Sequence, residues 1–497
     1  MKFNFLLIAA LCVLGSSCTK DLDLTPESSA TAQVFYGSVN DFQQATNAVY
    51  SGLQTYPNRA LDLYETRSDN VYGVSDDGKR YWDPINNLSP DLADKSVISS
   101  AWANNYNGIF KANTLLEQLN KNGDAVLTPA LKSRLEAEGR FLRAFYYFDL
   151  IRLFGRVPLI DKVVTAAEIT SIPRAEVENA YALIIADLEF AAANLPENYG
   201  ATEAGHATKY AAKGILAQVY MTRSGPTYNV KGPGMGTTEW TKAGALLDEI
   251  IASGKYRLLN TYNSIFAYDN ESNAEVVFDI QYISGGLGLG GEFPSLLLPD
   301  RYVQQVAGFA GGVMVRPPSA SLLASYPTGD KRSTFSIQNG YTIAGGATDS
   351  RPLLVKFLNV SKKGTRWTDW PLNFIVLRYT DVLMLKAECI LHDAAGSQSD
   401  VDEIVNDVRT RAGISPLANV NLDVLLAERQ REFIGEGIRW HDLVRSGNVV
   451  ALMNDWISKD DNQKAINTMK PEFVIYPVPQ NEINIVPGLY EQNSGYN

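Results

Sequence analysis

Apolar residues recur with a helical period over much of the first half of the chain, at the i, i+3, i+4 spacing that gives a helix one buried face. The longest such segment is followed by Gly155, and the last one by Pro196, and both residues commonly end helices. The pattern predicts helices over residues 39–54, 101–120, 131–154 and 176–195.

Two later pairs of helical segments resemble each other. Residues 208–223 precede 240–253, and residues 381–392 precede 401–412. Small residues stand where two antiparallel helices would touch, as in degenerate tetratricopeptide (TPR) hairpins. Together with the earlier helices they predict a mainly α fold, a TPR-like helical-repeat superhelix of about four helix pairs. The small residues are Ala211, Ala212, Gly214, Ala217, Ala387 and Cys389.

Residues 256–380 break this pattern. The stretch is rich in Gly, Pro and aromatic residues and has few helical runs, although residues 275–280 predict a strand. Long irregular stretches inside a globular chain are usually functional. We therefore expect an irregular, loop-rich capping region with a few short strands, packed on the helical scaffold.

The N-terminus resembles an export signal. Residues 5–14 form an apolar run that is too short to span a bilayer, which needs about 20 residues, and that suits a signal peptide. Leu14 to Cys18 resembles a loosened lipobox, with lipidation of the Cys18 thiol; a plain secretory signal with an incidental Cys is the alternative. The predicted organisation is a signal peptide (1–17), a lipidated tether (18–33), an N-terminal helical region (34–255), the capping region (256–380) and a C-terminal helical region (381–497).

The net charge of the chain limits its electrostatic partners. A charge of −11 over 497 residues argues against nucleic acid and against an anionic membrane surface.

The sequence also lacks common catalytic and metal-binding motifs. The three histidines are isolated, and the sequence holds no HExxH motif, no phosphate loop and no serine nucleophile elbow. Cys389 alone remains after the signal and the lipidated residue, so it has no disulfide partner. We expect no cofactor, no metal and no catalysis.

The run from Glu428 to Gly447 mixes dense charge with apolar residues. Glu428, Glu432 and Glu436 stand at i, i+4 and i+8, which would place them near one face of a single helix. An acid–base set with His441 is one interpretation, but acids and bases balance, which favours structural ion pairs with each other and with the backbone. The predicted ion-pair residues are Glu428, Arg431, Glu432, Glu436, Arg439, Asp442 and Arg445.

Several blocks follow one another in a fixed order along the chain: residues 137–150, 210–221, 329–332, 378–388, 428–447, 476–482 and 492–496. Together they resemble the SusD/RagB family of outer-membrane nutrient-binding lipoproteins, although Ser494 stands where proline is commoner in the family. The resemblance implies a lipoprotein anchored in the outer membrane through its lipid and facing outward. It also implies binding of an oligosaccharide or polysaccharide and delivery to a SusC-like TonB-dependent transporter.

Sugar recognition needs exposed aromatic faces interleaved with amides, acids and arginines. Two irregular stretches have this composition. The expected ligand-binding residues are Asp69, Asn70, Tyr72, Tyr81, Trp82 and Asn86 in one stretch, and Tyr302, Arg316 and Trp367 in the other. For Tyr81 and Trp82, plain packing is an equal alternative. Binding of peptides or other nutrients, or a glycoside hydrolase or lyase activity, are the competing functions.

Overall fold

The computed structural model describes residues 35–73, 80–308, 316–343 and 345–496. The predicted signal peptide, the lipidated Cys18 and the tether therefore lie outside the described residues. Among the helices that are described, none combines the length and the apolar character needed to cross a bilayer.

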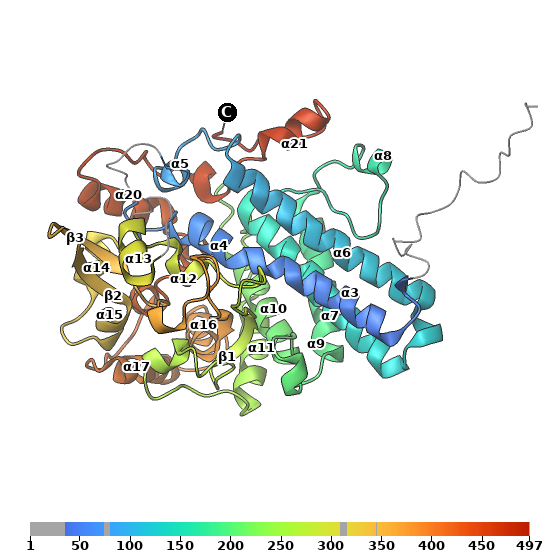
Figure 1. Cartoon of the computed structure of the whole chain (residues 1–497), viewed down its shortest axis with the longest axis horizontal. Coiled ribbons are helices and arrows are strands. Elements are labelled where there is room, and N and C mark those ends of the chain that lie inside the picture. The colour runs from blue at the N-terminus through green and yellow to red at the C-terminus, as the bar shows by residue number, and fades with distance from the viewer. Residues whose placement is uncertain (1–34, 74–79, 309–315, 344, 497) are drawn as a thin grey trace, which may run out of the picture.

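A row of eight packed helices forms the scaffold, and each helix packs against the next one in the series. Figure 1 shows the row running from α3, α6 and α7 on one side to α16 and α17 on the other. Taken two by two these helices make four successive pairs, which confirms the predicted mainly α, TPR-like architecture. The helices are α3 (Val39–Ser51), α6 (Ser96–Val126), α7 (Pro129–Phe154), α9 (Val177–Asn194), α10 (Lys209–Ser224), α11 (Trp240–Ala252), α16 (Tyr379–Leu391) and α17 (Gln398–Ala412).

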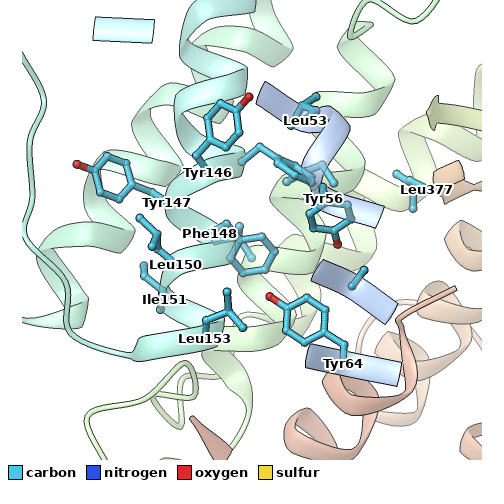
Figure 2. Close-up of a cluster of buried hydrophobic side chains, with 14 of the residues drawn as sticks. Leu53, Tyr56, Tyr64, Tyr146, Tyr147, Phe148, Leu150, Ile151, Leu153 and Leu377 are labelled. Carbon is cyan, nitrogen blue, oxygen red and sulfur yellow. The ribbon is translucent and has the colours of Figure 1, made fainter. Parts of the chain in front are cut away.

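Helix α7 packs against α6 and α9, and its sequence fixes both of its ends. The Thr128 hydroxyl accepts a hydrogen bond from the Leu131 amide at 3.3 Å, which caps the first turn. Gly155 ends the helix with φ of 66°, a conformation that favours glycine. Tyr146 and Phe148 are buried within the aromatic core that Figure 2 shows beside Tyr56.

The capping region contains two small antiparallel sheets, β1 (Val276–Ile280) with β4 (Phe374–Arg378), and β2 (Ile337–Thr342) with β3 (Thr348–Leu354). The predicted short strands are thus confirmed. Short helices that periodicity did not predict lie between them, because one or two turns are too short to show a period. These are α12 (Phe293–Leu296), α13 (Asp300–Ala307), α14 (Ala320–Ser325) and α15 (Lys331–Ser336).

The remaining elements are short or belong to the C-terminal part. The α-helices are α4 (Tyr56–Ala60), α5 (Asp83–Asn86), α8 (Ala166–Ile169), α18 (Leu422–Glu432), α19 (Arg439–Ser446), α20 (Val449–Asp460) and α21 (Gln480–Ile485). Short 3₁₀ turns are η1 (Gly52–Thr55), η3 (Ala201–Glu203), η4 (Asn263–Phe266), η5 (Val360–Lys362) and η6 (Pro471–Val474), and η2 (Leu61–Glu65) is a single π-helical turn.

The single helix predicted over Glu428–Gly447 is wrong. Helix α18 ends at Glu432, and α19 begins only at Arg439. Gly435 and Gly437 between them adopt φ of 78° and 70°, which a continuous helix cannot contain. The buried Glu65 carboxylate accepts both of their amides, at 2.8 and 3.1 Å, and so stabilises the break.

The side chains of this run nevertheless form a buried ion-pair network, and most of their partners come from elsewhere in the chain. Glu432 contacts Arg378 at 2.9 Å and Arg332 at 3.2 Å, and it also pairs with Arg411. Burial alone would raise the pKa of Glu432, but Arg411, Arg378 and Arg332 together lower it to about 2. We call these groups, with Glu428, Glu436, Lys356, Arg409 and Arg431, the Glu432 network.

Three other members of the predicted block pair outside this network. Arg439 binds both carboxylate oxygens of Asp69 at 2.8 Å. Arg445 contacts Asp442 and Glu388, each at 2.7 Å. His441, the proposed acid–base partner, packs against Tyr64 with ring centroids 4.1 Å apart, and burial keeps its pKa well below the usual value. Asp442 also accepts a hydrogen bond from Arg429 of α18 at 2.8 Å, so Asp442 and Arg445 join α19 to α18 and α16.

Residues near the C-terminus form hydrogen bonds with arginines of the N-terminal helical region. Arg67 donates to the Phe473 carbonyl at 3.0 Å and to the Tyr496 hydroxyl at 3.1 Å. Arg174 donates to the Asn493 side chain at 2.6 Å. The described chain is therefore tied together by contacts between residues hundreds of positions apart.

Candidate functional site

The two stretches in which we predicted ligand contacts lie side by side. Val71 forms a β-bridge with Pro318, and the Tyr72 amide donates to the Pro317 carbonyl at 3.0 Å. The Ser319 hydroxyl donates to the Asp69 carbonyl at 2.6 Å. Residues 69–73 and 316–319 thus form one continuous, largely buried contact between the helical scaffold and the capping region.

The nine predicted ligand-binding residues fall into two groups by the solvent exposure of their side chains. Asp69, Asn70, Trp82, Asn86, Tyr302 and Arg316 are each at most 8% exposed. Tyr72 and Trp367 are partly exposed, and Tyr81 is 39% exposed. A ligand can therefore reach the side chains of Tyr81, Tyr72 and Trp367 far more readily than those of the other six.

Most of the buried members use their polar atoms within the fold. The Asn70 amide donates to Glu65 at 2.8 Å. The Trp82 indole donates to the Gly73 carbonyl at 3.2 Å, while the Asn86 side chain accepts from the Gly73 amide at 2.9 Å. These contacts fix Gly73 against Trp82 and Asn86, which follow Tyr81 in the chain.

Two further predicted residues bond to neighbours away from Tyr81. The Tyr302 hydroxyl donates to Gln338 at 2.9 Å and its ring packs edge-on against Tyr341. The Tyr72 hydroxyl donates to Asp461 at 3.0 Å. The nine residues therefore do not converge on one point.

A compact polar group surrounds Tyr81, and we call Asn58, Asp62, Tyr81, Glu292 and Arg316 the Tyr81 cluster. The Tyr81 hydroxyl donates to Asp62 at 3.1 Å, and Arg316 pairs with the same carboxylate. The Asn58 amide donates to Glu292 at 2.7 Å. The cluster thus joins the N-terminal helical region to the capping region.

The Arg316 guanidinium is buried and fully engaged at its outer nitrogens. It donates to Asp62, to the Thr66 hydroxyl at 3.1 Å and to the Leu296 carbonyl at 2.8 Å. It also lies 4.9 Å from the centre of the Trp82 ring. Arg316 therefore organises the cluster, and Trp82 is the apolar support beneath it.

One helical face supplies the N-terminal half of the cluster. Asn58, Asp62 and Thr66 stand four residues apart across α4 and the π-helical turn η2, so their side chains emerge on the same side. Single π-helical turns occur often at functional sites. The neighbouring Arg59 instead points into the core, where it pairs with Asp149 at 2.7 Å.

Glu292 is the electrostatically unusual member of the cluster. Burial raises the pKa of Glu292 to about 7, the Asp62 charge adds to the rise, and the hydrogen bond from Asn58 opposes it. Burial likewise raises the pKa of Tyr81, so its hydroxyl stays neutral. Near neutral pH the cluster therefore offers both neutral and ionised acceptors to a ligand.

A glycine-rich loop borders the cluster on the capping side. Asp369 accepts the Gly286 and Thr365 amides, each at 2.9 Å, and thereby holds two loops together. Ser295 donates to the carbonyls of Glu292 and Trp367, at 3.3 and 3.1 Å, which places the partly exposed Trp367 segment next to the cluster. Ile283 (56%), Leu287 (71%) and Leu289 (42%) on this border are exposed.

This arrangement suits noncovalent recognition of a polyol. Tyr81 and Trp367 supply aromatic surface, while Asn58, Asp62 and Glu292 supply hydrogen-bonding groups. Across the part of the chain that the structure describes, no group of three or more His, Cys, Asp or Glu residues could hold a metal ion.

Sequence reasoning missed Asn58, Asp62 and Glu292. A usable signal exists for the first two, since polar residues at four-residue spacing interrupt an apolar helical segment. Glu292 has no such signal, because it stands alone in an irregular stretch and meets Asn58 only across 234 positions of sequence.

Two family models match most of the chain. A model described as "SusD family" matches residues 275–496, and one described as "Starch-binding associating with outer membrane" matches residues 21–221. The Tyr81 cluster takes its residues from both matched segments.

Individual relatives agree with these matches. A SusD-like protein from Bacteroides ovatus is 28% identical, over 89% of this chain and 82% of its own length. The structure of surface glycan-binding protein A from Bacteroides uniformis is 25% identical, with a TM-score of 0.77 over 92% of this chain and 99% of that one. A laminarin-binding SusD-like protein is also 25% identical, with a TM-score of 0.75 over 92% of this chain and all of its own.

Proposed function

Because this chain belongs to the SusD family, we propose that it binds an oligosaccharide noncovalently and delivers it to a partner TonB-dependent transporter in the outer membrane. The relatives' names support a glycan as ligand, since one is a surface glycan-binding protein and another binds laminarin. The lipid on Cys18 would anchor the protein at the outer face of that membrane.

The Tyr81 cluster is the observation that carries the assignment of the binding site. The Tyr81 ring is 39% exposed, and its hydroxyl is fixed by Asp62, so the ring is held in place before a ligand arrives. A sugar ring that lies against Tyr81 would place its hydroxyls near Asp62, the hydrogen-bond partner of Tyr81, and near Asn58 and Glu292 of the same cluster. Preorganised aromatic contacts lower the entropy cost of binding.

We infer that the other, buried residues predicted from the sequence support this surface and do not contact the ligand themselves. Arg316, Trp82 and Asn86 position Tyr81 and its backbone, and Asp69 and Asn70 tie the segment to the ion-paired core. Asp62 forms an ion pair with the buried Arg316, which suits a hydrogen-bonding role better than that of a catalytic acid.

Calorimetric titration against a glycan panel that includes laminarihexaose tests the proposal, with product analysis of the same samples. We expect binding of at least one glycan with no change in its chain length. Tyr81→Ala should weaken this binding at least about tenfold, or about 1.4 kcal/mol. Phe110→Ala, which removes an exposed aromatic ring on another surface, should leave it unchanged.

Three results would overturn the ligand class, the binding-only role or the site. Binding of peptides but of no glycan would replace the ligand class, and shortening of the glycan would make the protein an enzyme. Equal affinity of wild type and Tyr81→Ala for the same glycan would move the site elsewhere.

A further inference from the structure

A second surface carries apolar side chains that the proposed glycan site does not use. It lies where α6 meets α8 and α21, around a groove of about 280 Å³ that we call the α6 groove. Phe110 (56%), Ile169 (42%) and Ile485 (63%) line the groove and are exposed. Figure 1 shows α8 and α21 standing out from the body of the molecule near α6.

The floor of the groove is aromatic and fixed. The Trp102 ring lies 5.1 Å from that of Tyr106 and 6.4 Å from that of Tyr490, between ring centroids. The Tyr106 hydroxyl donates to the Pro158 carbonyl at 2.7 Å. A rigid aromatic floor with exposed apolar edges is typical of the centre of a protein–protein contact.

The two short helices beside the groove are only loosely attached to the core, which Ile483 of α21 contacts as a partly buried residue. Neither α8 nor α21 contains a buried residue. Ile169 and Ile485 therefore present apolar surface to water, although burying such a side chain is worth about 1.5–3 kcal/mol. Contiguous exposed apolar patches on a folded monomer usually mark an interaction site.

One carboxylate in the groove indicates the charge of the occupant. Glu482 accepts a hydrogen bond from Asn481 at 2.9 Å, and within the described residues it forms no ion pair. Lys162 also lines the groove, and the described residues show no ion pair between Lys162 and Glu482. A carboxylate next to aromatic faces attracts a lysine or arginine side chain, because the ring faces also carry negative potential.

We propose that the α6 groove binds an apolar surface segment of the partner transporter that carries one lysine or arginine, whose charge meets Glu482. The apolar residues of that segment would cover Phe110, Ile169 and Ile485. This inference rests on the proposed transporter partnership, and it adds the surface and the chemistry of the contact.

Co-purification of the tagged full-length lipoprotein with its transporter from outer membranes tests the inference. We expect the double variant Phe110→Asp, Ile485→Asp to recover at least tenfold less transporter than wild type. Glu482→Lys should cause a similar loss, and Glu482→Gln a smaller one. Leu417→Asp, an exposed apolar residue elsewhere on the molecule (36%), is the matched control and should match wild type.

The outcomes separate this inference from the glycan assignment. If the groove variants recover as much transporter as wild type, the inference about the groove alone is overturned. A concentration-dependent dimer of this protein that the same variants abolish would also overturn it. Absence of the transporter from the wild-type sample would overturn the partnership and the groove together. The glycan titration of the isolated protein is read independently of both.

Discussion

Glutamates occupy two contrasting environments in this molecule, the buried network around Glu432 and the partly exposed cluster around Tyr81. In the network each carboxylate meets several cations, and the pKa of Glu432 falls to about 2. In the cluster the Glu292 carboxylate accepts, among the described residues, a hydrogen bond from Asn58 alone, and its pKa rises to about 7. Saturated charges hold the scaffold together, while a carboxylate with spare hydrogen-bonding capacity can bind a ligand.

Removing a charge from the network should produce the largest effect. Glu432→Gln would leave Arg332, Arg378 and Arg411 buried without their shared anion. We expect the free energy of unfolding to fall by about 3–5 kcal/mol. Denaturant unfolding followed by circular dichroism measures this free energy. A decrease of less than about 1 kcal/mol would show that the network does not stabilise the fold as a unit.

The opposite shift of Glu292 predicts a pH dependence near neutrality. The folded protein keeps a proton on Glu292 up to about pH 7, whereas the unfolded chain releases it near the ordinary value of 4.5. Stability should therefore fall as pH rises from 4.5 to 7, by about 1–3 kcal/mol from this group.

The measurement compares unfolding free energies of wild type and Glu292→Gln at pH 5 and pH 8. The variant should lose less stability over this interval, while Asp279, whose pKa burial raises to about 6, contributes equally to both proteins. Parallel curves would contradict the assignment of a raised pKa to Glu292.

Replacement of Tyr81 separates stacking from hydrogen bonding. Tyr81→Phe keeps the ring but removes the bond to Asp62 at 3.1 Å. We expect a loss of glycan affinity smaller than the tenfold loss of Tyr81→Ala, about 1 kcal/mol or less. Calorimetric titration measures the glycan affinity of each variant. Equal losses of affinity in both variants would assign the whole contribution of Tyr81 to its hydroxyl.

The smallest effect should come from an exposed ion pair, also between an acidic and a basic side chain. Asp455 and Lys459 lie 2.6 Å apart on α20, with side chains 56% and 61% exposed. Asp455→Asn should change the free energy of unfolding by less than about 0.5 kcal/mol in the same assay. A loss as large as that of Glu432→Gln would show that burial does not distinguish the two settings.

Local sequence determined much of the scaffold. Helix α7 could be predicted because Thr128, Gly155 and its apolar period each act within a few residues. The break at Gly435 and Gly437 could not, since the charge spacing suggested one helix and the stabilising Glu65 lies 370 positions away.

The candidate site was harder to predict for the same reason. Composition identified the neighbourhoods of Tyr81 and Arg316, but not that Trp82 lies beneath the guanidinium as a packing residue. The partnership of Asn58 with Glu292 depends on how the capping region folds back on the scaffold. Spacing along the chain carries no information about such contacts.

The contacts of Arg67 have a consequence for how the chain folds. Its partners Phe473 and Tyr496 follow it by 406 and 429 positions, so this part of the core must wait for the C-terminal segment. Non-local contacts of this kind slow folding, because a long loop must close before they form. A chain that crosses a membrane N-terminus first would remain open, and accessible to chaperones and proteases, until its final residues arrived to complete the fold.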